Sequence, residues 1–517
     1  MNIKHIFPSA LIASLLLPST SCNKKFLELD PQGQLTKGQV LVDPNAANNL
    51  VTGVYNTLYL GAFDPTTVGF QYYMATDVAS DDADKGSTPT DFAPAADIDN
   101  FTVTPNNSIL NNLWIGYYKG IARANVALEQ LTNASFDETT RRRLVGETRF
   151  IRGMYYFNLV RLFGGVPKLI RVPTASEFNS DEFQTRVSKD EIYTIITDDL
   201  QYGVDSLPEK GDGATQVGRA TKGAAESFLA KVYMYKGDWQ KVFDLTNDVI
   251  NSGKYSLVVN KGDTLTDYNL IFREKAEGGA GGNNNSESIF EVQTGLNQTE
   301  DGVSKLYSNA QGPRGKGGWD DLGFGFNNPT QDLVNAYEPG DTRKAGTIIF
   351  INPTVAGNSP GTVLWDGFRI PSQDSVTNQR YNYKGYVSAL KESAQASNNK
   401  DTKPKNIRLM RYAEVLLMHA EAAATVGGDA LTPLNMVRSR AGLPAAPSAA
   451  QADIWKERRV ELAMEQDRFF DLVRQGRAGQ VLRAHGKGFV DGKNEIFPIP
   501  QAQIDLSGNR LAQNPNY

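Results

Sequence analysis

"ETTRRRLVGETRFIRGMYYFNLVRLFGGVP", residues 138–167, decides the class of fold, because its apolar side chains recur at the spacing of a helix. A stripe of this width predicts a long helix with one broad buried side. Gly164, Gly165 and Pro167 then end the helix. We therefore expect a mainly α-helical chain. The residues of the stripe are Leu144, Phe150, Ile151, Met154, Tyr155, Leu159 and Leu162.

Helical spacing returns in both directions along the chain. Residues 188–191 read Ser-Lys-Asp-Glu, a capping box that predicts the start of another helix. Residues 221–237 and 238–253, joined at Gly237-Asp238, match part of a tetratricopeptide-type hairpin. Such hairpins bury their apolar faces only by stacking on one another. Further helices are expected at 44–60, 110–131, 408–428, 431–442 and 450–476.

A different composition separates the two helical parts of the chain. Helical spacing is lost after about residue 255, and the segment is rich in glycine and asparagine. Short strands are expected at 288–294, 346–352 and 362–370. We predict one domain at 45–517. It would comprise a helical scaffold at 45–254 and 406–480, a loop-rich, partly β insertion at 255–405 and a coil at 481–517.

Cys22, the only cysteine of the 517 residues, directly follows an apolar run at 6–18 and three small residues. The run is too short to span a bilayer, which takes about 20 helical residues, and is typical of a signal peptide. We expect residues 1–21 to be removed and Cys22 to be acylated, with 22–44 as an extended, lipid-anchored tether. A plain secretory signal is the alternative. A lone thiol excludes an internal disulfide.

The overall composition excludes one class of partner and favours another. A net charge of −5 and an isoelectric point of about 5.5 argue against nucleic acid, which requires a basic surface. Tyrosine (21) and phenylalanine (24) are plentiful. Aromatic rings stack on the apolar face of a sugar, and amides or carboxylates bind its hydroxyls. The sequence is therefore consistent with a sugar-binding surface.

Candidate catalytic motifs fail on chemical grounds. A G-x-S-x-G match occurs at 357–361, but Pro360 lacks the backbone N–H that an oxyanion hole needs. His419 lies on the apolar side of its helix and is expected in the core. Glu461 and Glu465 lie one turn apart among arginines, so ion pairs are the better interpretation. We expect no enzyme and no cofactor, although a glycosidase built on another carboxylate pair stays open.

Two loops hold the candidate ligand-binding residues. Loops on a rigid scaffold are where binding residues concentrate, and these loops combine aromatic rings with acids and amides. Asp81, Asp82 and Asp84 also resemble a fragment of a calcium-binding loop without its distal glutamate, so calcium is a minor alternative to sugar hydroxyls. The candidates are Phe70, Tyr72, Tyr73, Asp81, Asp82, Asp84, Trp319, Phe324, Asn327, Asn328 and Trp365.

Several motifs in the same order resemble the SusD/RagB-like lipoproteins. They lie at 22–31, 113–125, 149–167, 411–422, 434–442 and 456–476, and the proline-rich ending is similar as well. Two departures occur. Asn516 stands where the family often has glycine, and Lys24-Lys25 replace acids that commonly direct surface export. The second departure leaves open whether the lipoprotein faces outward or into the periplasm.

The resemblance implies a fold, a place and a role. Such proteins have tetratricopeptide-like hairpins that cradle variable loops, and they sit as lipoproteins on the outer membrane of Bacteroidetes-type bacteria. Each caps a SusC-like TonB-dependent transporter, binds a glycan or sometimes a peptide, and is not an enzyme. By this resemblance the ligand residues lie in 61–108 and 278–370, whereas Trp114 and Tyr118 are structural.

Other functions stay open at this point. A peptide-binding lid would have the same build as a glycan-binding one. A surface glycoside hydrolase would release products from a polysaccharide. A purely structural transporter subunit would have no ligand site of its own. The glycan itself is not readable from the sequence, because no spacing of aromatic residues specifies a sugar linkage.

Overall fold

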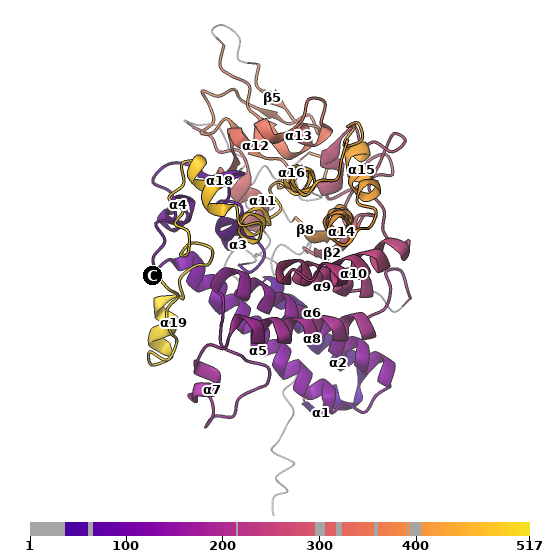
Figure 1. The fold of residues 1–517 in the computed structure, drawn as a ribbon, viewed down its shortest axis with the longest axis vertical. Coiled ribbons are helices and arrows are strands. Elements are labelled where there is room, and N and C mark those ends of the chain that lie inside the picture. The colour runs from indigo at the N-terminus through magenta and orange to yellow at the C-terminus, as the bar shows by residue number, and fades with distance from the viewer. Residues whose placement is uncertain are drawn as a thin grey trace, which may run out of the picture.

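The computed structural model describes residues 37–59, 66–213, 216–294, 305–316, 323–355, 360–388, 390–392 and 405–517. Figure 1 shows long helices stacked in the lower half of the molecule and, above them, a region of short helices, short strands and loops. The mainly α fold with a partly β insertion is thus confirmed. In these ranges no helix is long and apolar enough to cross a membrane.

α6 (Glu138–Phe163) is the central helix of the scaffold. It packs against α2 (Pro44–Tyr55), α5 (Ser108–Thr132) and α8 (Lys189–Ser206). Every residue from 150 to 163 is buried, which is more than the one side that the apolar stripe predicts. Neighbouring helices cover this part of α6 all round, so its polar side chains must find partners in the interior. The helix ends at Gly164, where φ is 75°, as predicted.

α9 (Lys222–Lys236) and α10 (Trp239–Asn251) form the predicted hairpin. Gly237 makes the turn in the left-handed region at φ 73°, and the Asp238 carboxylate caps α10. The Ser188 hydroxyl accepts a hydrogen bond from the backbone of Glu191 at 3.2 Å, which confirms the predicted start of α8 with Ser188 as its N-cap. α10 then packs on α14 (Tyr412–Val426), so a helix from the C-terminal part extends the same stack.

The predicted long helix at 450–476 is wrong, because the structure divides it into α16 (Gln451–Glu461) and α17 (Arg468–Arg474). The carbonyl of Glu461 accepts hydrogen bonds from Arg411 (2.8 Å), Tyr268 (2.9 Å) and Lys384 (3.0 Å). These partners satisfy the end of α16 and take the place of a further helical turn. Met464 and Gln466 then adopt positive φ angles of 65° and 72°, which reverse the chain.

The described residues contain short strands, which pair in antiparallel fashion as four two-stranded sheets; β1 and β8 come from outside the insertion, and the other six lie within it. The strand expected at 288–294 is present, the one at 346–352 is shortened, and the one at 362–370 is a hairpin of two strands. The pairs are β1 (Ala83–Gly86) with β3 (Phe326–Pro329), β2 (Ser288–Val292) with β8 (Ile407–Arg411), β4 (Ile348–Phe350) with β7 (Arg380–Asn382), and β5 (Thr362–Val363) with β6 (Arg369–Ile370).

Short helices occur where the sequence predicts only loop, coil or tether. Helices of one or two turns carry too few periodic positions to stand out from loop sequence, so the loop expected at 61–108 and the coil expected at 481–517 are corrected here. The short helices are α1 (Lys37–Val42), α3 (Phe70–Thr76), α4 (Ala93–Asn100), α7 (Asp181–Gln184), α11 (Lys305–Gln311), α12 (Gln331–Ala336), α13 (Thr342–Thr347), α18 (Ala478–Ala484) and α19 (Gln501–Leu506). The remaining elements are α15 (Leu431–Arg440) and the 3-10 helices η2 (Asn56–Tyr59) and η3 (Tyr268–Phe272).

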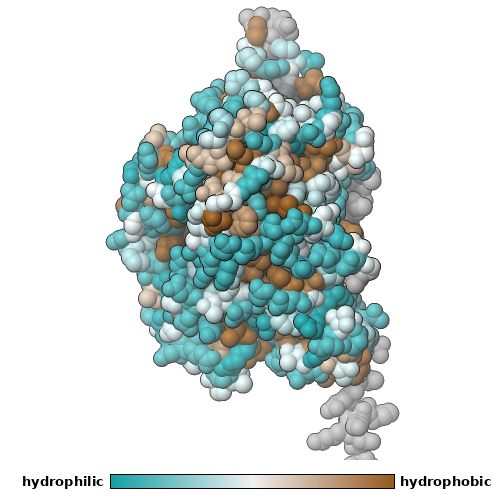
Figure 2. Space-filling view, turned by 45° about the vertical axis from the view of Figure 1, so that its right-hand side comes forward, coloured by the Kyte–Doolittle hydropathy of each residue, from teal (hydrophilic) through white to brown (hydrophobic). Residues whose placement is uncertain are grey.

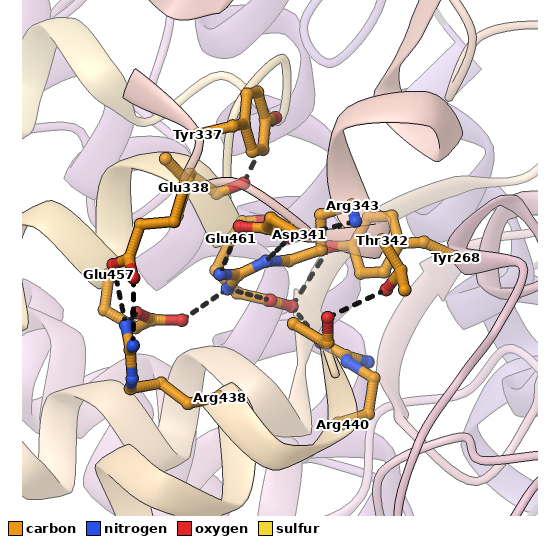
Figure 3. A network of polar contacts seen from close by, with 12 residues as sticks. Tyr268, Tyr337, Glu338, Asp341, Thr342, Arg343, Arg438, Arg440, Glu457 and Glu461 are labelled. Carbon is orange, nitrogen blue, oxygen red and sulfur yellow. Dashed lines mark hydrogen bonds and ion pairs between the residues drawn. The ribbon is translucent and has the colours of Figure 1, made fainter. Parts of the chain in front are cut away.

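A buried network of charges joins the scaffold to the insertion (Figure 3). The Glu461 carboxylate is fully buried and forms ion pairs with Arg343 of α13, Arg411 of β8 and Arg440 of α15. Burial alone would raise the pKa of Glu461, but the guanidiniums of Arg440, Arg411 and Arg343 hold it well below its usual range. Glu461 and Glu465 are ion-pair partners as predicted, but the partners come from distant elements and not from the same helix, and Glu465 pairs with Arg411 at 2.7 Å.

The surface has its own pattern on the side that carries α10 and α15. Figure 2 shows apolar side chains gathering near the middle of this face, interrupted by hydrophilic ones, with hydrophilic residues dominating towards the edges. Half-exposed apolar residues on this part of the chain include Leu431 and Met436 of α15, at 41% and 40% exposure. Scattered apolar residues of this kind are ordinary for a folded protein.

Glu461→Ala tests the dependence of the fold on the buried network. The variant should lower the free energy of unfolding by about 3–5 kcal/mol, because it leaves buried guanidiniums without a shared carboxylate. Urea unfolding followed by circular dichroism measures the change. Glu138→Ala is the control, since it removes an ion pair whose carboxylate is 60% exposed, and it should change stability by no more than about 0.5 kcal/mol. Equal effects of the two variants would contradict the assignment.

Candidate functional site

The pairing of β1 with β3 brings together the two loops in which the sequence places ligand residues. In the register Asp84 lies opposite Asn328 and Gly86 opposite Phe326. Gly86 has a φ of 69°, and a side chain there would collide with Asn328 and with the backbone of Gly325. The strands can therefore approach this closely only with glycine at position 86.

Four phenylalanines gather beside this strand pair, and we call them the aromatic junction: Phe70, Phe92, Phe324 and Phe326. The ring centroid of Phe70 lies 5.3 Å from that of Phe92 and 5.5 Å from that of Phe326. Phe326 is buried, whereas the other three are half-buried and pack against the main core. Rings held in this way combine a fixed orientation with partial exposure, which is what stacking on a ligand requires.

The backbone around the aromatic junction is strained. Ser87, Phe92 and Asn327 have φ angles of 56°, 49° and 56°, in the left-handed region that residues other than glycine seldom adopt. Each costs on the order of 1 kcal/mol or more. Such strain persists only where surrounding contacts hold it, and it concentrates at functional sites. At Phe92 the strained backbone sets the position of a half-buried ring.

Polar groups line the edge of the junction. The Ser87 hydroxyl lies 2.7 Å from the carbonyl oxygen of Phe324 and 2.8 Å from the Asp91 carboxylate, and these two acceptors share its single proton. Arg314 donates to the Ser87 hydroxyl at 2.6 Å and forms an ion pair with Asp91. The hydroxyl of Ser87 is the main reason that the pKa of Asp91 falls to about 2. A charged carboxylate, a guanidinium and a hydroxyl thus stand next to the aromatic faces.

Phe70 and Phe324 are the predicted site residues that the structure brings into the junction. Tyr72, Tyr73 and Asn327 belong to the interior instead, at 5%, 0% and 0% exposure. Burial raises the pKa of Tyr72, whose hydroxyl donates to Asn158 at 3.1 Å. Tyr72 and Tyr73 belong to the core because α3 packs them against α5 and the scaffold. Asn327 is buried on β3.

Asp81 and Asp82 are also buried, which corrects their interpretation as sugar or solvent contacts. Asp81 pairs with Arg468 at 2.7 Å and with Arg459 at 2.8 Å, and Asp82 pairs with Arg459 at 2.8 Å. Despite its burial, the pKa of Asp81 is lowered to about 2, mainly by Arg468. Arginines therefore pair with two of the three carboxylates considered for calcium, Asp81 and Asp82. Among the described residues no three or more His, Cys, Asp or Glu side chains are grouped to hold a metal ion.

The other predicted residues lie in different surroundings. Asp84 is exposed and lies 3.5 Å from His485. Asn328 is 6% exposed, and its amide makes no hydrogen bond. Trp365 is not part of the junction, because it packs on a separate apolar cluster in the insertion with the guanidinium of Arg273 3.8 Å from its ring centroid. Trp319 and Cys22 lie outside the described residues, so their roles stay predictions.

Sequence reasoning missed Ser87, Phe92, Asp91 and Arg314 as site residues. Three of them lie within the first loop that the sequence already selects, and the arginine lies within the glycine-rich second loop. A charged side chain isolated among glycines, such as Arg314, is a signal that predicts a specific partner for that side chain. Its partners, Ser87 and Asp91, depend on the β1–β3 pairing and are not visible in the sequence.

Comparison with protein families finds two matches. The model described as the SusD family matches residues 286–517, and the model described as starch-binding, associating with the outer membrane, matches residues 25–234. The two matches together take in most of the scaffold, both strands of the β1–β3 pair and the C-terminal helices, and residues 235–285 lie between them.

Individual proteins agree with these matches. A SusD-like protein of Bacteroides ovatus is 26% identical over 487 residues, covering 90% of this chain and 81% of that protein. SusD-like protein P2 of Formosa agariphila is 25% identical over 527 residues, covering 97% and 98%. Among solved structures, a laminarin binding SusD-like protein is 29% identical with a TM-score of 0.73, covering 92% of this chain and 99% of that one. Surface glycan-binding protein A from Bacteroides fluxus is 25% identical with a TM-score of 0.72, covering 92% and 99%.

Asp77 beneath the strand pair predicts a pH dependence of stability. Its carboxylate accepts hydrogen bonds from Asn327 at 3.1 Å and from the backbone of Gln466 at 2.8 Å, but burial still raises its pKa to about 7. An acid with a raised pKa in the fold binds a proton on folding. Its contribution to stability is therefore fully present below about pH 4 and is lost as the pH rises through about 7.

Asp77→Asn should make the melting temperature less dependent on pH between about pH 4 and pH 7, because the amide does not ionise. Thermal unfolding at several pH values measures this. Asp205→Asn is the control, since Asp205 is exposed on α8, and it should reproduce the wild-type curve. A wild-type curve in the Asp77→Asn variant would contradict the assignment.

Proposed function

The chain belongs to the SusD/RagB family, and from this premise we propose that it is an outer-membrane lipoprotein that binds an oligosaccharide at the aromatic junction. The bound glycan would pass to a SusC-like TonB-dependent transporter, for which the protein would act as the lid. The anchor would be the acylated thiol of Cys22. One acyl chain alone gives only marginal membrane binding, so further acylation or the transporter would have to add to it.

The observation that carries the proposal is the composition of the junction. Half-buried rings from two segments, Phe70 with Phe92 and Phe324, lie beside the hydroxyl, carboxylate and guanidinium of Ser87, Asp91 and Arg314. Sugar sites need an apolar ring face and convergent polar groups of this kind. The names of the laminarin-binding and glycan-binding relatives support a glycan over a peptide as the ligand.

The surroundings of Glu461 and Glu465, the two carboxylates considered for hydrolysis, favour binding over catalysis. Glu461 is fully buried, and Glu465 pairs with Arg411 and Lys384. A glycosidase needs two carboxyl groups that reach the scissile bond, one of which keeps a proton to donate. Guanidiniums hold the pKa of both groups low, which leaves neither as a general acid.

Titration calorimetry of the purified protein with a panel of oligosaccharides and peptides tests the proposal, with laminarin-derived and starch-derived oligosaccharides included first. Phe92→Ala and Phe324→Ala should each weaken binding by about tenfold, because a lost stacking face is worth about 1 kcal/mol or more. Reducing-end assays on the same samples should show no hydrolysis.

Phe178→Ala is the matched control, since Phe178 is 59% exposed in the scaffold and lies outside the junction. It should leave affinity unchanged. Unchanged affinity in both junction variants would remove the aromatic junction as the binding site. Release of reducing ends would replace the lid with a hydrolase, and binding of peptides alone would replace the glycan.

A further inference from the structure

A hollow of about 740 Å³ lies in the scaffold, away from the aromatic junction. It opens where the end of α6, the start of α8, the turn between α9 and α10, and α17 meet the C-terminal segment. None of the residues of the aromatic junction lines it. Its size falls within the range of small-molecule sites, which is roughly 300–1,000 Å³.

Aromatic rings and a buried arginine line the hollow. Tyr193, Tyr235, Trp239 and Phe470 are among its lining residues. The Arg161 guanidinium lies 4.2 Å from the ring centroid of Phe470 and 5.5 Å from that of Tyr235. The hollow therefore combines flat apolar faces with a fixed positive charge, as binding sites for small polar ligands do.

Arg161 has a donor that the protein leaves unused. The side chain is only 9% exposed, and it donates to the hydroxyl of Tyr72 at 2.9 Å and pairs with Asp467 at 3.5 Å. The guanidinium also donates to Asn158 at 2.5 Å and interacts with the Tyr235 hydroxyl, although neither its Nε–H nor that hydroxyl makes a hydrogen bond of regular geometry. A buried donor without a partner costs about 1–3 kcal/mol. Both atoms are themselves buried, so Arg161 and Tyr235 form a fixed wall of the hollow.

The lining carries an excess of positive charge. Lys189, Lys236 and Lys493 line the hollow, and in the described part of the chain none of them forms an ion pair with a carboxylate. Lys189 and Lys236 lie 5.7 Å and 5.3 Å from the ring centroid of Tyr193. The lining contains a single acid, Glu495. Arg161 and Arg474 are balanced by buried carboxylates, so the excess comes from the three lysines.

We infer that this hollow binds an acidic oligosaccharide, charged through carboxylate or sulfate groups. The lysines would bind the anionic groups as mobile point charges, which suits either chemistry. The rings of Trp239 and Tyr193 would contact the sugar faces. The choice of a sugar as carrier of the charge rests on the proposed function, whereas the choice of an anion rests on the lining alone.

The test is titration calorimetry of the purified full chain with four ligands: oligogalacturonate, its methyl-esterified neutral form, a sulfated galactan oligosaccharide and poly-glutamate. We expect oligogalacturonate or the sulfated sugar to bind more tightly than the neutral form by about tenfold or more, with affinity falling as salt is raised. The two charged sugars distinguish carboxylate from sulfate. Trp239 in the lining should also report binding through its fluorescence.

The variant Lys236→Gln with Lys493→Gln should weaken binding of the acidic sugar by about tenfold, because two unpaired cations are lost. The control is Lys241→Gln with Lys254→Gln, which removes the same charge from exposed lysines outside the hollow and should bind like wild type. Phe324→Ala should also bind the acidic sugar like wild type, so the proposed function and this inference can fail separately.

Three results would overturn the inference. The first is equal binding of the charged and neutral sugars, which would mean that the lysines select nothing. The second is equal weakening in the two double variants, which would place the effect in overall charge and not in the hollow. The third is binding of poly-glutamate as tightly as the acidic sugars, which would make the hollow a contact for an acidic protein segment.

Discussion

The buried carboxylate of Glu461 is the group on which the rest of the structure depends. Three arginines, Arg343, Arg411 and Arg440, converge on it from three different elements, and all are fully or almost fully buried. A buried charge is tolerable only when it is paired and hydrogen-bonded, and removing one partner leaves the others uncompensated in a medium of low dielectric. The insertion and the C-terminal helices therefore hold their positions together. The same residue ends α16, because its backbone carbonyl is satisfied by side chains instead of by another helical turn.

The turn that follows α16 connects this network to both candidate sites. The backbone of Gln466 binds Asp77 beneath the β1–β3 pair, and Arg468 binds Asp81 just before β1. Asp467 pairs with Arg161 at the hollow and with Lys231 of α9. Buried polar contacts of this kind are strongly directional, so they orient the elements they join. The aromatic junction and the cationic hollow thus stand at fixed places on one framework, although their ligand chemistry differs.

The sequence predicted the helices best where a long apolar period or a cap was present, as in α6, α8 and the α9–α10 hairpin. It failed at 450–476, since the break depends on Arg411, Lys384 and Tyr268, which lie far away along the chain. Asp81 and Asp82 looked like a solvated acidic loop for the same reason. Their partner Arg459 follows Asp82 by 377 residues, and no local pattern reveals a contact of that range. Of the predicted ligand residues, Phe70 and Phe324 lie in the junction, whereas Tyr72, Tyr73 and Asn327 are buried.

By itself the sequence determined the class of fold and the family resemblance, and it predicted a division into scaffold and insertion and two loops in which ligand residues should be sought. The fold class and the division follow from composition and from periods of three to four residues, and the resemblance follows from short motifs in a shared order; all of these signals are local. The tertiary structure alone decided which aromatic rings are in contact, which acids form ion pairs with arginines and which lysines have no carboxylate partner. Those outcomes depend on pairings between distant segments, such as Gly86 with Phe326, and a side chain's chemistry depends on whether such a pairing buries it, satisfies it or leaves it at the surface.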